Sequence, residues 1–187
     1  MLKIDNLHKS FGEKIVLNGF TAELPTKSKT LITGKSGAGK TTLLRIIAGL
    51  EIADSGKVTI DGEGVISYMF QEPRLLPWMN VHDNINAVLK YPDTEKTVYL
   101  LEELGLKDEI YSMPGELSGG MKRRVALARS LIYPADVYLF DEPFAGLDPA
   151  MAKTAADVIL KYTDGKTVLI VSHDTSMFDD KISSITL

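Results

Sequence analysis

The feature that most constrains the fold is the stretch GKSGAGKT, Gly34–Thr41, which follows a predicted strand and precedes a helical pattern. It fits the pattern G-x-x-x-x-G-K-[ST] in full. Glycines at this spacing let successive backbone N–H groups turn inward around an anion, and the N-terminus of the following helix adds positive potential. The stretch therefore predicts a phosphate-binding loop between a strand and a helix. The alternative is a chance match in a glycine-bearing turn.

Short apolar strands alternate with helical patterns along the chain. VYLF (137–140) and TVLIVS (167–172) predict buried strands, and VALARSLI (125–132) and MAKTAADVILKY (151–162) predict helices. Strands of this kind belong to a parallel sheet that helices cover on both faces. We therefore expect an α/β fold with a mostly parallel sheet flanked by helices. Residues 2–33 are predicted to form short strands, giving a small N-terminal antiparallel β part.

Length and composition set the wider limits. The 187 residues suit one domain, 1–187, with an inserted helical subdomain at about 80–135, and 44% hydrophobic with 25% charged residues is a globular composition. The net charge of −4 argues against a surface built to hold nucleic acid. The start lacks the apolar core of a signal peptide, and no apolar run approaches the ~20 residues that span a bilayer. Work at a membrane would therefore need a partner.

Two acids follow the first buried strand, in VYLFDEP. Asp141 is expected at the carboxyl end of the strand, where ligands bind in parallel sheets and where a carboxylate can hold Mg²⁺. Glu142 follows directly and is the candidate general base for an attacking water. The alternative is that the two acids form a solvated strand end or a helix start before Pro143. With the phosphate loop, these acids predict an enzyme that hydrolyses a nucleoside triphosphate, and no N-K-x-D base reader of a GTPase occurs.

A second stretch, LSGGMKRR at 117–124, also has the features of an anion site. Ser118 is a good helix N-cap, and Gly119 and Gly120 leave the helix start unobstructed. The three cations at 122–124 lie in the first turns of the helix, where its dipole disfavours them. They would be explained by an incoming phosphate, or they form a solvated or ion-paired face. One nucleotide needs only one phosphate cradle, so this one needs a different explanation.

With LSGG placed between the phosphate loop and VYLFDEP, the sequence resembles the ATP-binding-cassette (ABC) ATPases over essentially the whole chain. Gln71 in MFQEP matches the Q-loop of that family, AGLD (145–148) matches its D-loop, and His173 in IVSHD matches its switch histidine. Phe11 in KSFG matches the aromatic residue that stacks on adenine. Taken alone, such a histidine is more often a capping or surface residue, and such a phenylalanine is more often part of the core.

The resemblance implies ATP and Mg²⁺ as the nucleotide and its metal. The residues that it assigns to ATP are Phe11, Gly34, Ser36, Gly37, Ala38, Gly39, Lys40, Thr41, Thr42 and Asp148. The residues that it assigns to hydrolysis are Glu142, His173, Lys40 and Gln71, and those that it assigns to the metal are Thr41, Gln71 and Asp141.

The resemblance also explains the second cradle. In the family, Ser118, Gly119 and Gly120 would contact the ATP that the phosphate loop of a second copy binds, so two copies bury two ATP molecules between them. Hydrolysis then opens the dimer. The commonest signature of the family ends in glutamine where this chain has Met121. Some importers carry the same methionine, which marks a subfamily.

The segment QEPRLLPWMNVHDNI (71–85) resembles importer ATPases for nitrate, sulfonates and taurine. In that family this region receives a helix of the membrane permease, and the apolar loop residues 75–78 suit such a contact. A small buried core beneath the helical subdomain is the alternative. The resemblance also implies a solute-binding protein in the same system. The sequence is shorter than most members and ends fourteen positions after His173, so we expect no C-terminal regulatory domain.

The prediction is therefore an ATPase subunit of an ABC transporter that imports small anionic solutes such as sulfonates or nitrate. It is expected at the cytoplasmic face of the membrane, without nucleic acid as a partner. The first alternative is a soluble ABC ATPase that acts on DNA or ribosomes, although the coiled-coil insertion or second cassette of such proteins is missing. The second is an adaptor that binds nucleotide without turnover, against which Glu142 and His173 argue.

Overall fold

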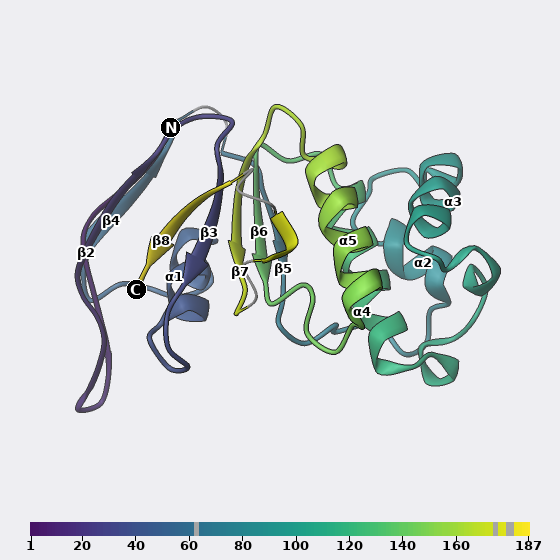
Figure 1. Ribbon diagram of the computed structural model, residues 1–187, viewed down its shortest axis with the longest axis horizontal. Helices are drawn as coiled ribbons and strands as arrows, with labels where there is room; N and C mark the ends of the chain where they lie inside the picture. Colours follow the sequence, from purple (N-terminus) through teal and green to yellow (C-terminus); the bar gives the residue numbers. More distant parts are fainter. Residues whose placement is uncertain (62–63, 174–175, 179–181) are drawn as a thin grey trace. The chain divides into compact units, whose positions relative to one another are not determined.

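The computed structural model describes residues 1–61, 64–173, 176–178 and 182–187 (Figure 1). The chain divides into two compact units. The first, here called the β unit, consists of residues 1–68, 135–141 and 165–187. The second, here called the helical unit, consists of residues 69–134 and 142–164. The predicted single domain, with a helical subdomain at about 80–135, stays a prediction.

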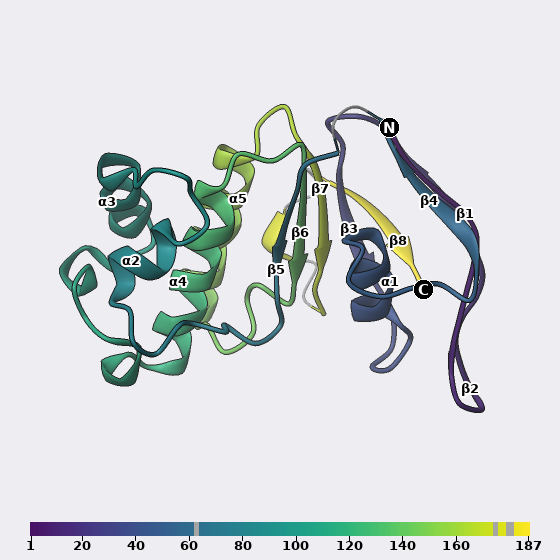
Figure 2. The same cartoon turned by 180° about the vertical axis from the view of Figure 1, so that it is seen from behind.

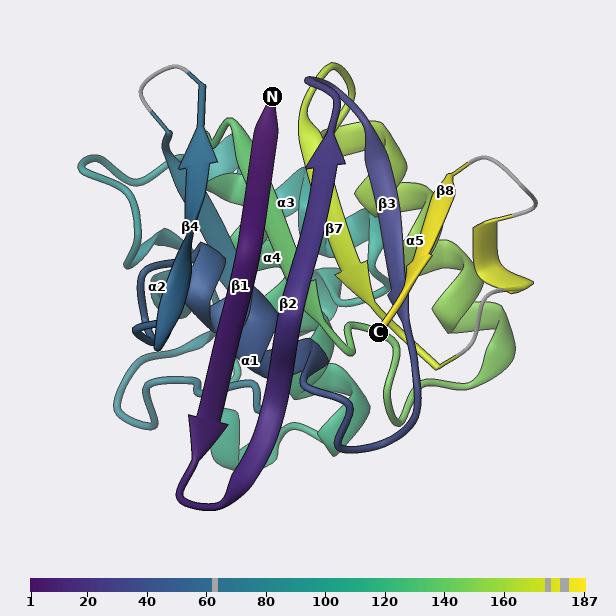
Figure 3. The ribbon, with the colours of Figure 1, turned by 90° about the vertical axis from the view of Figure 1, so that its left-hand side faces the viewer.

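An antiparallel sheet forms the N-terminal part of the β unit (Figure 3). Its strand order is β2-β1-β4, with bounds β1 (Leu2–Phe11), β2 (Lys14–Leu24) and β4 (Ser55–Ile60). The antiparallel character was predicted, but the prediction of short strands was wrong, because β1 and β2 have 10 and 11 residues. Register shifts in β1, at residues 4–8 and 9–10, interrupt the alternation of apolar and polar residues. Because the alternation is interrupted, the sequence of one long strand resembles that of several short strands.

The second sheet has the order β5-β6-β7-β3-β8 within the described residues (Figure 2). Its bounds are β3 (Lys29–Thr33), β5 (Ile66–Met69), β6 (Val137–Asp141), β7 (Thr167–Val171) and β8 (Ser183–Thr186). The pairs β6–β7, β7–β3 and β3–β8 are parallel. Every residue of β6 and β7 is buried, as the apolar runs in the sequence predict. The strand before the phosphate loop, β3, and the strand that ends at Asp141, β6, therefore belong to the same sheet.

The core of the β unit surrounds α1 (Lys40–Ile47). One face of this helix buries Leu43, Leu44 and Ile47, and the same apolar cluster includes residues from both sheets. Complete burial of a leucine side chain stabilises a fold by about 1.5–3 kcal/mol. Helix α1 is thus held by this apolar cluster, and its position fixes the loop that leads into it.

The helical unit contains α2 (Val81–Asn86), α3 (Thr94–Glu103), α4 (Gly119–Ile132) and α5 (Pro149–Tyr162) (Figure 1). Short 3-10 helices lie at Lys107–Glu109 and Pro114–Glu116, and one of the β unit at Ser176–Phe178. Gly105 follows the end of α3 with a φ of 65°, which confirms the predicted glycine cap. Among the described residues, no helix is long and apolar enough to cross a bilayer.

Candidate nucleotide-binding site

The phosphate loop leaves β3 at Thr33 and runs into α1 at Lys40. Its backbone requires glycine, because Gly37 and Gly39 have φ angles of 79° and 98°, which residues with a side chain rarely adopt. A Cβ atom on Gly39 would also lie 2.7 Å from Cγ1 of Val16 in β2. The loop is therefore packed against β2 in one shape, which glycine alone accommodates.

The other loop residues complete a tight turn. The amide of Ala38 donates to the carbonyl of Lys35 at 3.1 Å. Ser36 is exposed, whereas Ala38 and Thr42 are half-buried. The exposed side of the turn therefore carries backbone groups and a hydroxyl, the donors that phosphate oxygens accept from.

The side chain of Lys40 turns back over this loop and is only 7% exposed. Its Nζ donates to the carbonyls of Gly34 at 2.9 Å and Lys35 at 3.1 Å. An ammonium group has three donors, so one remains for a phosphate oxygen. Within the described part of the chain, no side chain caps the N-terminus of α1, whose first amides are further donors for an anion.

Asp141 ends β6 and is fully buried, and both of its carboxylate oxygens accept a hydrogen bond. The hydroxyl of Thr41 donates to Oδ1 at 3.1 Å, and the hydroxyl of Tyr68 donates to Oδ2 at 3.2 Å. Burial raises the pKa of Asp141 above its ordinary value, and the two hydrogen bonds oppose that rise. Burial and the neighbouring charge of Asp141 raise the pKa of Tyr68, so the phenol stays a donor.

Thr41 and Asp141 thus place a hydroxyl and a carboxylate side by side at the end of the parallel sheet. Hard oxygen donors are the ligands that Mg²⁺ prefers, and it commonly uses one or two protein ligands with phosphate oxygens and water. A divalent cation would also favour the ionised form of the buried carboxylate. These two residues fit the metal that the sequence predicts.

Phe11 lies at the end of β1 and is 50% exposed, which excludes the alternative of a core residue. The ammonium of Lys9 lies 4.9 Å from the centroid of the Phe11 ring. His173 follows β7 and is exposed, so it is not part of the core either. Its neighbour Asp174, the last residue of the IVSHD motif, lies outside the described residues.

The LSGG stretch begins α4 in the helical unit. The side chain of Ser118 accepts from the amide of Met121 at 3.2 Å, which confirms the predicted N-cap. Gly119 is exposed, and a Cβ atom there would have no atom within 4 Å. A Cβ atom on Gly120 would lie 3.4 Å from the carbonyl oxygen of Gly146. One side of the helix start is therefore open, while the other packs on the turn before α5.

Two of the three cations at 122–124 donate hydrogen bonds to backbone carbonyls, which neither predicted explanation included. Arg123 donates to the backbone carbonyl of Glu142 at 2.7 Å. Arg124 donates to the carbonyl of Leu104 at 2.6 Å and less closely to that of Gly105. A guanidinium group has several donors in fixed directions and therefore suits such carbonyls. The explanation of these cations by an incoming phosphate is thus not needed for either arginine.

Glu142 opens the segment that leads from β6 to α5. It is half-buried, and its φ of 53° lies in the left-handed region, which costs a residue with a side chain about 1–2 kcal/mol. Asp148 ends the segment as the N-cap of α5, accepting from the amide of Met151 at 3.0 Å. Strained backbone of this kind persists where the surroundings hold it, and it is frequent at functional sites.

The segment after β5 has no regular structure and carries the predicted permease contact. Gln71 is exposed and Trp78 is 70% exposed, while Leu75 and Leu76 are half-buried. The fully buried Asn84 side chain accepts from the amide of Leu76 at 2.7 Å and donates to its carbonyl at 3.0 Å. The segment is therefore anchored to the helical unit by Leu75, Leu76 and Asn84, while the indole of Trp78 is exposed.

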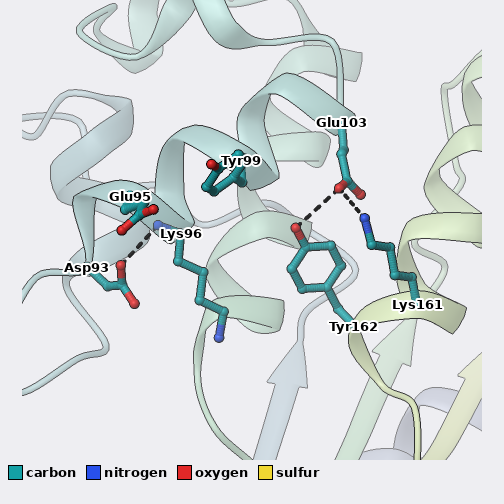
Figure 4. A pocket seen from close by; sticks show the side chains of 7 residues that line it. All are labelled: Asp93, Glu95, Lys96, Tyr99, Glu103, Lys161 and Tyr162. Atoms are coloured by element: carbon teal, nitrogen blue, oxygen red, sulfur yellow. Dashed lines mark hydrogen bonds and ion pairs between the residues drawn. The ribbon is translucent and has the colours of Figure 1, made fainter.

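A pocket of about 330 Å³ lies in the helical unit between α3 and the end of α5 (Figure 4). It contains none of the predicted site residues. Figure 4 shows Lys161 and Tyr162 both directed at Glu103, and Lys161 forms an ion pair with that carboxylate at 2.5 Å. This cluster joins α3 to α5 and explains the pocket as a packing feature.

Two residues of the site are missing from the sequence prediction. Tyr68 contacts Asp141 because β5 lies beside β6, although the two strands are far apart in the chain. Arg123 contacts Glu142 because α4 packs on the turn before α5. Among the predicted residues, the β unit joins the loop and Thr41 to Asp141, and the helical unit joins the LSGG helix to the segment from Glu142.

Comparison with known proteins agrees with this geometry. The ABC transporter family matches residues 17–145. The aliphatic sulfonates import ATP-binding protein SsuB of Corynebacterium glutamicum is 41% identical over 181 residues, which covers 92% of this chain and 74% of the relative. SsuB 2 of Agrobacterium fabrum is also 41% identical, covering 92% and 70% of the two chains.

Solved structures give the same result. The dimeric structure of MJ0796, a bacterial ABC transporter cassette, has a TM-score of 0.88 and 27% identity, covering 100% of this chain and 94% of that one. A dimeric post-hydrolysis state of the ATP-binding cassette MJ0796, bound to ADP and Pi, has a TM-score of 0.83 and 28% identity, covering 95% and 90%. The predicted α/β fold is thereby confirmed.

The fold, the phosphate loop and the buried acid at the end of β6 make this chain a P-loop NTPase. Within that class, the chain belongs to the ABC transporter family, the family of ATPases that its sequence resembles.

Proposed function

We propose that this chain is the ATPase subunit of a membrane transporter that imports small anionic solutes, such as sulfonates or nitrate. The observation that carries the proposal is the joint placement of Lys40, Thr41 and Asp141, which offers an ammonium, a hydroxyl and a buried carboxylate to one nucleotide and its metal. The relatives named above are import subunits, and this favours transport over a soluble role on DNA or ribosomes.

Binding of ATP is assigned mainly to the β unit. The third donor of Lys40 and the amides of the loop bind the β- and γ-phosphates, and the exposed ring of Phe11 stacks on adenine. The remaining loop contacts are assigned to Gly34, Ser36, Gly37, Ala38, Gly39, Thr41 and Thr42. Asp148 in the D-loop also belongs to the proposed nucleotide site.

Mg²⁺ is assigned to Thr41, Asp141 and Gln71. The ion supplies positive charge to the β- and γ-phosphate oxygens as negative charge develops during phosphoryl transfer. The pair of Thr41 and Asp141 supports the assignment by its 3.1 Å separation and its burial. Gln71, which is exposed, is included on its match to the Q-loop.

Hydrolysis is assigned to a water that Glu142 deprotonates as general base. Gln71 and His173 orient this water, and Lys40 stabilises the charge on the transferred phosphoryl group. The position of Glu142 directly after the metal-binding Asp141 supports its assignment, and so does its strained backbone.

The second partner is another copy of the chain. Ser118, Gly119 and Gly120 are assigned to the ATP bound by that copy, and the open space beside Gly119 supports close approach of a phosphate. The MJ0796 cassettes named above are dimeric. ATP binding then closes the pair of copies, and hydrolysis removes the contact that held them.

The third partner is a membrane permease, contacted through the segment 71–78 with Trp78 outward. Together with a solute-binding protein, these subunits would form the importer. The ATPase is then a peripheral protein on the cytoplasmic face of the membrane.

The direct test is hydrolysis of ATP by the purified chain. We expect release of phosphate from ATP that depends on Mg²⁺ and stops when the metal is chelated. Equal release from buffer and protein, under conditions in which ATP binds, would contradict the proposed activity.

Tyr68→Phe should raise the Mg²⁺ concentration needed for half-maximal hydrolysis about tenfold, since loss of a ligand's supporting hydrogen bond typically costs 10–100-fold. The phenol orients Oδ2 of Asp141 and lowers its pKa, and phenylalanine does neither. The measurement is a Mg²⁺ titration of phosphate release at saturating ATP. Tyr99→Phe, at an exposed position in the helical unit, is the control. An unchanged midpoint in Tyr68→Phe would show that the phenol does not support the metal site.

Trp78→Ala should weaken association with the permease at least about tenfold and leave ATP hydrolysis by the isolated chain within twofold. An indole that is 70% exposed contributes little to the fold, so the free energy of unfolding should change by less than about 1 kcal/mol. The measurements are recovery of the permease subunit from detergent-solubilised membranes and thermal unfolding. Tyr91→Ala is the matched control, because Tyr91 is 74% exposed in the same unit. A loss of several kcal/mol of stability would instead support the buried-core alternative.

A further inference from the structure

The backbone carbonyl of Glu142 accepts a hydrogen bond from a side chain of the LSGG helix. With its φ of 53°, Glu142 lies in a region that residues with a side chain leave unless contacts hold them there. Nη1 of Arg123 donates to the carbonyl oxygen of Glu142 at 2.7 Å. This bond is short, and its donor is charged, so it is among the stronger kinds of hydrogen bond in proteins.

Arg123 is well placed to act on that backbone. It lies in α4, five residues after the N-cap Ser118 that opens the LSGG helix. The side chain is half-buried, so its guanidinium group is partly shielded from water. The same carbonyl of Glu142 also accepts from the amide of Ala145 at 3.3 Å, which closes the turn on the other side. The orientation of Glu142 is therefore fixed by its own turn and by the LSGG helix.

A second contact joins the same two segments. The start of α4 at Gly120 packs on the turn before α5 so closely that a Cβ atom there would lie 3.4 Å from the carbonyl oxygen of Gly146 and from Cδ2 of Leu147. A Cβ atom at these distances would be in ordinary van der Waals contact, so the start of α4 lies against this turn. The LSGG helix and the segment that begins at Glu142 are thus in contact at two points.

We infer that Arg123 is a positioning residue for Glu142: it holds the backbone of the general base in its left-handed conformation and ties it to the helix that carries LSGG. The inference rests on the proposed function, in which Glu142 is the base and LSGG binds the ATP of the second copy. A helix that engages the partner's nucleotide then also sets the orientation of the base in its own chain. Binding across the dimer and readiness for hydrolysis are thereby coupled within the helical unit.

The test compares Arg123→Met with Arg123→Lys. Methionine retains the apolar stem of arginine and has no donor, whereas lysine retains a charged donor. We expect Arg123→Met to lower kcat about tenfold, with the KM for ATP and the ATP affinity within twofold of the parent, because Arg123 is not among the residues assigned to ATP and its guanidinium group donates to the carbonyl of Glu142. Arg123→Lys should recover at least half of the lost rate on a logarithmic scale.

A double-mutant cycle separates positioning from general stabilisation. If Arg123 acts through Glu142, the change Arg123→Met should lower the residual rate of Glu142→Gln by less than twofold. An equal tenfold loss in both backgrounds would overturn the inference, and so would an unchanged kcat in Arg123→Met. If Arg123→Met fails to fold, Arg123→Leu, which is also apolar and has no donor, carries the same cycle, with the same two outcomes deciding it.

The failure of this inference is distinguishable from failure of the proposed function. A parent protein without Mg²⁺-dependent hydrolysis would remove the proposed function itself. If the parent hydrolyses ATP and Arg123→Met has the same kcat as the parent, only the positioning role is removed.

Discussion

Changing Lys40 to alanine is expected to weaken ATP binding by roughly 10- to 100-fold, because hydrogen bonds to charged groups contribute about 1.5–3 kcal/mol each. Lys40 is 7% exposed and already has two of its three donors on the loop carbonyls, so its ammonium is held where a phosphate is expected. The measurement is isothermal titration of ATP into the parent and the variant. Hydrolysis should fall at least as far, because the same ammonium is proposed to stabilise the transferred phosphoryl group.

The matched control for this variant is Lys57→Ala, which removes an equal charge from an exposed position of β4 in the same unit. It should bind ATP within twofold of the parent. Thermal unfolding has to show that Lys40→Ala remains folded, since two hydrogen bonds to the loop are lost with the side chain. A folded Lys40→Ala variant with unchanged ATP affinity would remove the phosphate-loop assignment.

Changing Glu142 to glutamine is expected to lower kcat by about 10²–10⁴-fold, the usual contribution of a general base, while ATP affinity stays within a few-fold. Glutamine has nearly the same shape and the same backbone preferences as glutamate, so the left-handed turn at this position should survive. What is lost is the carboxylate that accepts the proton of the attacking water. The measurement is single-turnover hydrolysis of bound ATP alongside a binding titration.

The control for this change is Glu95→Gln, which removes an exposed carboxylate from the first turn of α3. Its kcat should stay within twofold of the parent. If Glu142→Gln hydrolysed ATP at the parental rate, another group would have to be the base, and the chemistry assigned to this segment would be wrong.

The local parts of the site were predictable from the sequence. The phosphate loop could be predicted because its glycines, its lysine and its flanking strand and helix all lie within about twenty residues. The place of Asp141 could be predicted because the four apolar residues before it indicate a buried strand, and ligands bind at the carboxyl ends of such strands. The caps at Ser118 and Gly105 could be predicted because helix caps depend on the type of residue next to the helix end.

The parts that depend on packing were not predictable. The contact of Tyr68 with Asp141 requires β5 to lie beside β6, and nothing in either strand states that order. The bond from Arg123 to Glu142 requires α4 to pack on a turn that begins 19 residues after Arg123 in the chain. From the local sequence, the arginines were predicted to meet an incoming phosphate or to form a solvated or ion-paired face. The carbonyls that they bind come from other segments, which the local sequence does not indicate.

Glu142 shows the same limit in its backbone. A glutamate before a proline gives no local reason for a φ of 53°, since glycine and asparagine are the residues that adopt this region readily. The sequence predicted its chemistry from its place after Asp141, and the structure added that its carbonyl accepts hydrogen bonds from Arg123 and from the amide of Ala145.

The central claim is that each ATP is bound between the phosphate loop of one copy and the LSGG of another. The mass of Glu142→Gln in solution tests it most directly, because this variant is expected to bind ATP and keep it. Light scattering after size-exclusion chromatography should give the mass of one chain, 20.5 kDa, without nucleotide and twice that mass with ATP and Mg²⁺. A variant that binds ATP and keeps the mass of one chain would contradict the shared site.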